Sequence, residues 1–190
     1  MRKLKLQVQI SIDGFIAGPN GEMDWLAYPW DQELEAYVEA LTAPVDCIVL
    51  GRRLAEGFIP HWAAVVADEA NPEAATGRKF TDTPKVVFST TLEQSPWANT
   101  ALAQGDLPAE ITRLKQQPGQ DIIAYGGATF VSGLIRAGLI DEYHLFVNPT
   151  AIGQGKAIFQ ELAAAQPLTL VQARSFACGI VVLHYQPRRA

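Results

Sequence analysis

The sequence predicts an α/β fold in which a mainly parallel sheet has helices on both faces and an antiparallel hairpin at its end. Short apolar segments typical of buried strands alternate with amphipathic helical segments along most of the chain. Near the end of the chain, strand-like segments at 168–174 and 180–185 flank a turn that contains Gly179, a pattern typical of a hairpin. The length of 190 residues fits one domain, which we expect to span residues 1–190.

The strands and helices are predicted from the spacing of apolar residues. Apolar and polar side chains alternate from Leu4 to Ile12, a period of two that indicates a strand. Short apolar runs complete the set of predicted strands, which are 4–12, 47–50, 85–89, 122–125 and 143–147. The helices are predicted at about 31–42, 108–117 and 128–137. The stretch 60–83 contains Pro60 and Pro72 and is expected to be a loop with some helix.

Composition and charge restrict the compartment and the partners. The net charge of −5 and the scattered Lys and Arg residues argue against a nucleic-acid-binding face. No segment approaches the ~18 uninterrupted apolar residues of a membrane span, so we expect a cytoplasmic protein without membrane contact. Cys47 and Cys178 are expected to be free thiols. Because His61, His144 and His184 show no metal-ligand spacing, no metal site is expected.

The turn that precedes the last predicted helix is the first candidate binding site. Gly126 and Gly127 form this turn, and Ala128 and Thr129 open the helix. A helix N-terminus has unpaired N–H groups and a partial positive charge, and glycines let a phosphate approach the backbone closely. No acidic residue follows soon enough to cap the helix and repel a phosphate. A tight turn without a ligand is an equally good interpretation of the glycine pair alone.

Two more predicted strands end in groups that suit a phosphate. Gly51 follows an apolar strand and precedes Arg52 and Arg53, whose planar guanidinium groups bind phosphate oxygens well. Ser89 and Thr90 follow another strand and offer hydroxyl and N–H donors. Taken singly, the arginines also fit solvated charges and the hydroxyls fit a polar loop. Since ligands of open α/β sheets bind at the carboxyl ends of strands, we interpret the three strand ends together as one phosphate site.

Other polar residues near the N-terminus leave alternatives open. Gln7, Gln9 and Ser11 share one face of the first predicted strand, which indicates either an edge strand or a face that lines a cleft. Asp31 lies among aromatic residues, a setting that raises a carboxyl pKa and suits general acid–base chemistry, and Asp24 is an alternative acid. Asp31 also stands at the start of a predicted helix, where Asp is a favoured N-cap. Capping and catalysis are both consistent with the sequence.

A set of short motifs occurs in order over about residues 4–160, at 11–18, Trp25, 50–53, 88–90, 125–128, 139–143 and 149–155. This ordered set resembles the dihydrofolate reductase superfamily, and most closely the branch with the reductase domain of bacterial riboflavin biosynthesis. The sequence departs from the family at Leu54, where the family usually has Thr, and by one extra residue between Trp25 and Asp31. It has no deaminase motif, so a fused bifunctional enzyme is not expected.

The resemblance implies a doubly wound sheet with NADPH lying across the carboxyl ends of its strands. It implies that the pyrophosphate contacts the glycine turn and the first helical residue, with a cis peptide between the two glycines. It implies that the adenosine 2′-phosphate is held by Arg52, with Ser89 and Thr90 nearby.

For the other half of the cleft, the resemblance implies that the nicotinamide is flanked by Ile16, Ala17 and the loop that ends at Gly21. Asp31 would lie near the acid that anchors the pteridine ring in dihydrofolate reductases. A homodimer is expected as well, because domains of this branch often pair and the hairpin would otherwise leave an open sheet edge.

We therefore expect an NADPH-dependent oxidoreductase that reduces a C=N or C=O group of a small pteridine or pyrimidine-like heterocycle. One alternative is the 5-amino-6-(5-phosphoribosylamino)uracil reductase of riboflavin biosynthesis. That substrate needs a further basic group for its own phosphate, and Arg78, Lys79 and Lys156 are the candidates. The other alternative, from a different functional class, is a nucleotide-binding protein without catalysis.

Overall fold

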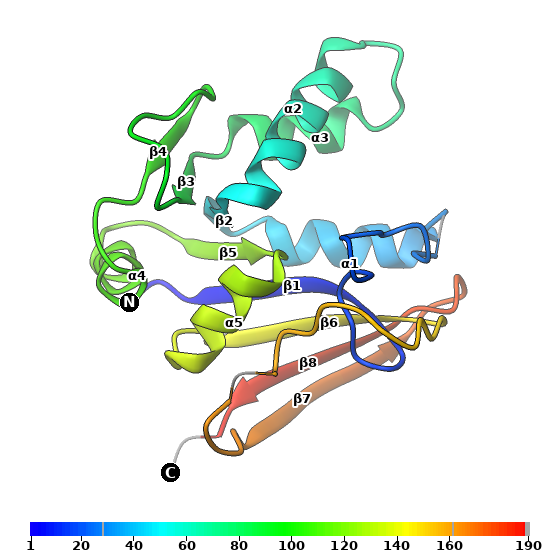
Figure 1. Ribbon diagram of the computed structural model, residues 1–190. Coiled ribbons are helices and arrows are strands. Elements are labelled where there is room, and N and C mark those ends of the chain that lie inside the picture. The colour runs from blue at the N-terminus through cyan, green and yellow to red at the C-terminus, as the bar shows by residue number, and fades with distance from the viewer. Residues whose placement is uncertain (28, 161, 189–190) are drawn as a thin grey trace.

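The computed structural model describes residues 1–27, 29–160 and 162–188. Its strands form a single sheet in the order β4-β3-β2-β5-β1-β6-β8-β7, with helices on both faces (Figure 1). None of the described helices is long and apolar enough to cross a membrane. The strands are β1 (Leu4–Ser11), β2 (Val45–Gly51), β3 (Lys85–Phe88), β4 (Thr100–Leu102), β5 (Asp121–Tyr125), β6 (Glu142–Asn148), β7 (Leu168–Ser175) and β8 (Val181–Pro187). The helices are α1 (Gln32–Thr42), α2 (Arg52–Ala67), α3 (Ala74–Asp82), α4 (Leu107–Gln116) and α5 (Ala128–Arg136).

The directions of the strands confirm the predicted architecture. From β4 to β6 along the sheet, each neighbouring pair is parallel. The last two strands form the predicted hairpin, in which β8 pairs antiparallel with both β6 and β7. β1 lies inside the sheet between β5 and β6, so the edge-strand interpretation of its polar face is wrong.

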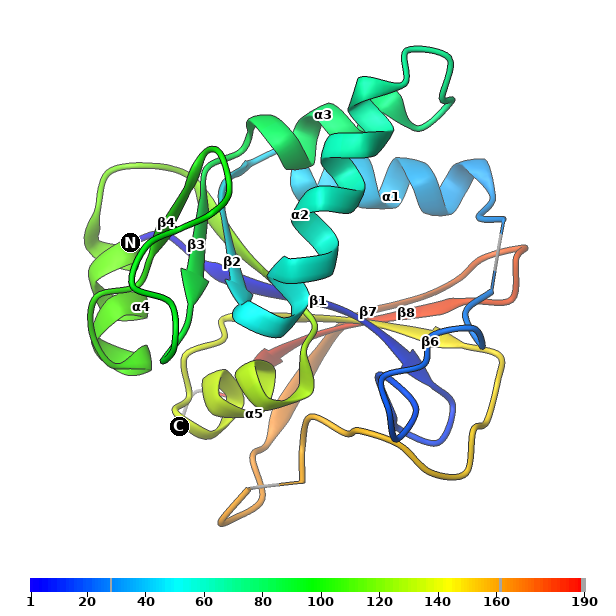
Figure 2. The ribbon, with the colours of Figure 1, turned by 45° about the horizontal axis from the view of Figure 1, so that its top comes forward.

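The side chains of β1 divide between the two layers of helices. On the opposite face from α4 and α5, the ammonium of Lys5 donates a hydrogen bond to the carbonyl of Leu41 in α1. α2 and α3 cover this same face over β2 and β3, as Figure 2 shows. The residues of β1 that pack in the cluster under α4 and α5 are Leu4, Leu6, Val8 and Ile10.

The segment between β2 and β3 is more helical than the sequence predicts. The stretch 60–83, expected to be a loop with some helix, contains the end of the 16-residue helix α2 and all of the nine-residue helix α3. Pro60 lies inside α2, where a proline removes one backbone hydrogen bond and costs roughly 3 kcal/mol. Aromatic packing offsets that cost, because Phe58 and Trp62 flank Pro60 and both rings contact Phe80 of α3.

Candidate functional site

The three segments predicted to bind phosphate lie side by side at one edge of the sheet. Gly51 at the end of β2 pairs in register with Phe88, the last residue of β3, so Ser89 and Thr90 follow directly beside it. β5 pairs with β2 on the other side and leads into Gly126. The strand order therefore brings together residues that are distant in the sequence, and it confirms their common location.

Close backbone packing joins the starts of α2 and α5. A Cβ atom on Gly51 would lie 2.8 Å from the Cβ of Phe130 in the first turn of α5. The ring of Phe130 in turn lies 5.2 Å from that of Phe88, centroid to centroid. A Cβ atom on Gly127, whose φ is +93°, would lie 3.8 Å from the Cβ of Leu54 in α2. The two helix N-termini thus lie against each other at the strand ends (Figure 2).

The N-termini of α2 and α5 lack side-chain caps. Their N-cap residues, Gly51 and Gly127, offer no side-chain acceptor, and neither helix has an acidic residue in its first turn. By contrast, α1 and α4 are capped by Asp31 and Asp106 and carry acidic residues in their first turns. Uncapped N–H groups with a partial positive charge attract an anion, and the N-termini of both helices lie at the same edge of the sheet. Ala128 and Thr129, the first residues of α5, are half-buried and exposed, respectively.

The guanidinium groups at this edge are accessible. The Nη1 of Arg52 forms an ion pair with the carboxylate of Glu56, one turn further along α2. The Arg52 side chain is one-third exposed and that of Glu56 about half exposed, at 33% and 49%. Because an exposed ion pair between residues i and i+4 contributes only about 0.3–0.5 kcal/mol, an incoming phosphate can replace Glu56 readily. Arg53 is exposed.

The hydroxyl groups after β3 are arranged in a tight turn. The Oγ of Ser89 accepts hydrogen bonds from the backbone N–H groups of Thr91 and Leu92, at 3.2 and 3.0 Å. The Ser89 Oγ also lies 3.4 Å from the Oγ1 of Thr91, where either hydroxyl can be the donor, and Thr90 is exposed. The turn therefore presents donors next to Gly51.

The loop after β1 forms a rim on another side of the site. The N–H of Ile16 donates to the carbonyl of Lys156, and the N–H of Lys156 donates to the carbonyl of Ala17, both at 2.8 Å. A Cβ atom on Gly155 would lie 2.2 Å from the Ala17 oxygen, so this pairing requires glycine there. A Cβ atom on Gly126 would lie 4.0 Å from the Cδ1 of Ile16. The rim that was expected to flank the nicotinamide thus lies near the glycine turn.

Two further groups define this rim. Gly21, with a φ of +101°, lies in the predicted loop, and a Cβ atom on it would be 3.8 Å from the Nζ of Lys156. The carboxylate of Asp13 accepts hydrogen bonds from the N–H groups of Ile152 and Gly153. A hydrogen bond from Ser11, followed by these backbone bonds, lowers the pKa of Asp13. Asp13 therefore fixes the loop that carries Lys156.

Asp31 is the N-cap of α1. Its Oδ1 accepts from the N–H of Leu34 and its Oδ2 from the N–H of Cys178, both at 2.9 Å. The hydrogen bond from Cys178, followed by that from Leu34, lowers the pKa of Asp31. Of the two interpretations of Asp31, capping is the one that the structure confirms, and the lowered pKa does not suit a proton donor at neutral pH. A contact between Asp31 and a substrate stays a prediction, and Asp24 is exposed.

Asn148 is a polar residue at this edge that the sequence reasoning missed. It is fully buried at the end of β6, in register with Ser11. Its Nδ2 donates to the Oε1 of Gln9 at 2.9 Å, and its Oδ1 accepts from the N–H of Ala27 at 2.9 Å. Asn148 therefore positions both the amide of Gln9 and the loop before α1. A polar residue directly after the apolar run 145–147 is the signal that could have found it.

The fold is that of a dihydrofolate reductase-like α/β protein. The model of the RibD C-terminal domain family matches residues 2–182. The chain therefore belongs to the RibD C-terminal domain family, the reductase branch that the ordered motifs indicated.

The chain is also similar to individual proteins. The chain is 31% identical over 187 residues to the uncharacterized protein YyaP of Bacillus subtilis (strain 168), covering 97% of this chain and 94% of YyaP. Its fold is similar to that of a protein assigned to riboflavin biosynthesis from Shewanella sp. PV-4, with a TM-score of 0.73, 22% identity and full coverage of both chains. It is also similar to the diaminohydroxyphosphoribosylaminopyrimidine deaminase/5-amino-6-(5-phosphoribosylamino)uracil reductase of Thermotoga maritima, with a TM-score of 0.69 and 18% identity. That match covers 98% of this chain but 57% of the Thermotoga protein.

Proposed function

We propose that this protein is a reductase that uses NADPH to reduce a C=N or C=O group of a ribosylated aminopyrimidine phosphate or a closely similar heterocycle. The observation that carries the proposal is the pair of uncapped helix N-termini, of α2 and α5, at neighbouring strand ends. Membership of the RibD C-terminal domain family supports a reductase of riboflavin-type substrates over a reductase of pteridines.

The residues at the strand ends fit the phosphates of a dinucleotide. Gly127 has a positive φ and no Cβ, so its backbone is accessible to a pyrophosphate at the start of α5. Arg52, once released from Glu56, would bind the 2′-phosphate together with the donors of Ser89 and Thr90. When bound, NADPH supplies the hydride; the work of the protein is to orient the reacting carbon atoms and to exclude water.

The three candidate groups for a substrate phosphate lie in different parts of the structure. The Nζ of Lys79 donates to the carbonyl of Val45 at the amino end of β2, away from the strand ends of the site. Arg78 precedes Lys79 in the same helix and is exposed. The Nζ of Lys156 lies next to Gly21, on the rim formed with Ile16 and Ala17. We therefore propose Lys156 as the group that binds the substrate phosphate.

The test compares oxidation of NADPH with a ribosylaminopyrimidine phosphate, with the same compound lacking the phosphate, and with dihydrofolate. The phosphorylated pyrimidine should be reduced most efficiently, and Lys156→Ala should raise KM for it while leaving KM for the dephosphorylated compound unchanged. Efficient reduction of dihydrofolate alone would favour the pteridine reductase. Tight NADPH binding without oxidation with any of the three compounds would contradict catalysis of these reactions and favour a nucleotide-binding protein.

A further inference from the structure

We propose that Glu142, His144 and His184 form a binding site for a divalent transition-metal ion, with Zn²⁺ as the best match. The site lies on the face of the sheet that α1 covers. It lies toward the amino ends of β1 and β6, whereas the proposed dinucleotide site lies at the carboxyl ends of the strands. Neither the cofactor nor the substrate of the proposed reductase is needed for it.

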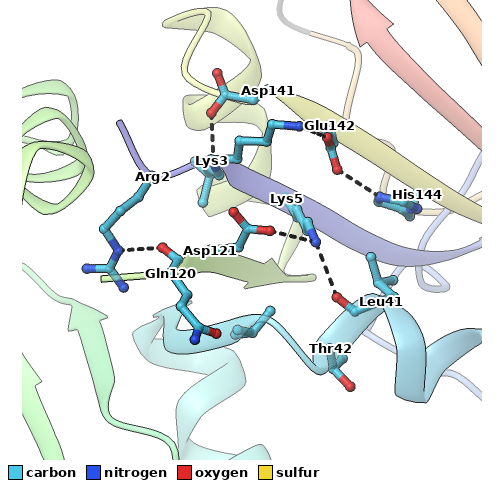
Figure 3. Close-up of polar contacts among 12 residues, drawn as sticks. Arg2, Lys3, Lys5, Leu41, Thr42, Gln120, Asp121, Asp141, Glu142 and His144 are labelled. Atoms are coloured by element: carbon cyan, nitrogen blue, oxygen red, sulfur yellow. Dashed lines mark hydrogen bonds and ion pairs between the residues drawn. The ribbon is translucent and has the colours of Figure 1, made fainter. Parts of the chain in front are cut away.

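Strand pairing creates the cluster. Glu142 and His144 are alternate residues of β6, so their side chains project from the same face of the sheet. His144 pairs in antiparallel register with His184 of β8, and the two imidazole rings stack with centroids 4.2 Å apart. The sequence separation of the two histidines hides this pairing, which spacing along the chain does not reveal. Figure 3 shows Glu142 and His144 directed toward each other beside Lys3 and Lys5.

The distances suit a metal ion. The Oε2 of Glu142 lies 3.6 Å from the Nε2 of His144 and 3.8 Å from the Nε2 of His184. One ligand atom from each residue lies within 4.8 Å of the others. In a tetrahedral zinc site with ligands at about 2.0–2.1 Å, neighbouring ligand atoms are roughly 3.3 Å apart. To bind a common ion, the oxygen and the two nitrogens would have to move closer together, and the imidazole rings, now stacked at an interplanar angle of 17°, would have to turn toward the ion.

The ligand nitrogens have no hydrogen-bond partners. Among the described residues, the Nε2 atoms of both His144 and His184 are buried without one. The side chains of His144 and Glu142 are 5% and 9% exposed, so His144 cannot turn to water for a partner. Buried polar atoms are nearly always satisfied in native proteins, and an unpartnered buried pair next to a carboxylate points to a missing ligand. A metal ion would satisfy both nitrogens at once.

The surroundings orient the ligands. The hydroxyl of Tyr37 in α1 lies 2.9 Å from the Nδ1 of His144. If that Nδ1 carries the proton and donates it to Tyr37, the Nε2 keeps its lone pair for a metal, as in other sites where a second contact fixes the imidazole. Glu142 divides its two oxygens: Oε1 accepts from Lys3 at 2.7 Å, while Oε2 faces the histidines.

The types of ligand favour a late transition metal. Two imidazoles and one carboxylate match zinc and the neighbouring late transition metals better than Mg²⁺ or Ca²⁺. His184 is 15% exposed, which leaves access for the ion and for a water as its fourth ligand.

Nearby lysines set the strength of binding. Lys5 is paired with Asp121 at 2.8 Å, whereas Lys3 shares the carboxylate that the metal needs. Repulsion between the ion and Lys3 should weaken binding, so removing this ammonium should tighten it severalfold. Lys3 is suited to such a test because its side chain is 55% exposed and its replacement should not disturb the core.

The experiment titrates Zn²⁺ into tag-free, chelator-treated protein by calorimetry and repeats the titration with Co²⁺ by absorption spectroscopy. We expect one ion per chain, with cobalt bands of nitrogen and oxygen ligation and none of thiolate ligation. His184→Phe keeps a stacked ring but removes a ligand, and it should weaken binding at least about tenfold. Lys3→Met should tighten it. His61→Phe, which removes the exposed histidine of α2, is the matched control and should not change the affinity.

Each outcome decides for or against the site. Absence of saturable binding to the wild-type protein would overturn it, as would equal affinities of the wild type and a folded His184→Phe variant. Loss of binding in His61→Phe would assign the ion to the surface instead. If circular dichroism shows that His184→Phe is unfolded, Lys3→Met decides: tighter binding supports the site, and unchanged or weaker binding contradicts it. NADPH binding, measured by fluorescence, tests the dinucleotide site separately.

Discussion

The backbone of Gly51 lies directly against Phe130, because a Cβ atom on Gly51 would be only 2.8 Å from the Cβ of Phe130. This contact places the start of α2 against the first turn of α5. The neighbouring atom is itself a Cβ, which is fixed to the backbone and cannot move as the end of a long side chain can. The geometry of the two helix N-termini therefore depends on the absence of a side chain at Gly51.

Gly51→Ala should destabilise the fold and weaken the dinucleotide site. The added methyl group would separate α2 from α5, and overpacking of this kind costs roughly 1–3 kcal/mol. Gly57→Ala is the matched control, because Gly57 lies inside α2 with open space around it. It should raise the free energy of unfolding by about 0.5–1 kcal/mol. Urea unfolding measures both, and equal stabilities of the two variants would contradict the packing described for Gly51.

Arg52→Ala should weaken NADPH much more than NADH. A hydrogen bond to a charged group contributes about 1.5–3 kcal/mol, so the loss for NADPH should be roughly tenfold to hundredfold, with little change for NADH. Glu56→Gln is the complementary variant, because it removes the ion pair that holds Arg52 and should tighten NADPH by about twofold. Fluorescence titration with both cofactors measures these affinities. Equal losses for NADPH and NADH would remove the assigned role of Arg52.

Asp31→Ser should lower the melting temperature at neutral pH, with a difference that disappears in acid. Serine can still accept from the N–H of Leu34, but it lacks the charge that also binds the N–H of Cys178. Because the pKa of Asp31 is lowered in the folded state, its charge stabilises the protein above the ordinary Asp pKa of about 3.9. That contribution is lost as the pH falls below this value toward the folded pKa. Thermal unfolding of both proteins across this range measures the effect, and a pH-independent difference would contradict it.

The same variant tests the catalytic role predicted for Asp31. If Asp31 only caps α1, the Asp31→Ser variant should retain the kcat and KM of the wild type for the heterocyclic substrate, at temperatures where the variant is folded. If Asp31 also anchors the substrate, the loss of its charge should raise KM or lower kcat in the folded variant. Steady-state kinetics distinguishes the two roles that the sequence left open.

We predict that two copies of the chain associate through the outer strand β7. β7 forms one edge of the sheet, and Leu170 and Val171 on it are each about half exposed. The register shifts between Leu170 and Gln172, so the strand is irregular where these apolar side chains emerge. Analytical ultracentrifugation should find a homodimer that Leu170→Lys converts to a monomer, since a charge on an edge strand opposes pairing. A monomeric wild-type protein, or a dimer that is unaffected by Leu170→Lys, would contradict this interface.

Much of the fold could be predicted from local patterns. The alternation from Leu4 to Ile12 identified β1 because a half-polar strand has a clear period of two. The extent of α2 could not be predicted, because Pro60 is a strong local signal against a helix and its cost is offset only by packing against α3. β4 has three residues, all at least partly exposed, and such a short edge strand leaves no periodic signal.

The site was predictable where it depends on residues that follow strands. Gly51, Ser89 and Gly126 could be placed together because the carboxyl ends of parallel strands meet at one edge of a sheet. The position of β8 between β6 and β7 could not be predicted from spacing, so neither could the contact of His144 with His184. Interactions between strands that are distant in the sequence depend on this order.

The central claim is that the N-termini of α2 and α5 bind the phosphates of NADPH at the carboxyl edge of the sheet. Backbone amide NMR of the protein titrated with NADPH tests it most directly, because each N–H group reports on its own surroundings. The account predicts that the largest chemical-shift changes fall on Gly51, Arg52, Gly127, Ala128 and Thr129, with smaller changes at Ser89 and Thr90. Saturable NADPH binding that leaves these amides unchanged and shifts others would contradict the account.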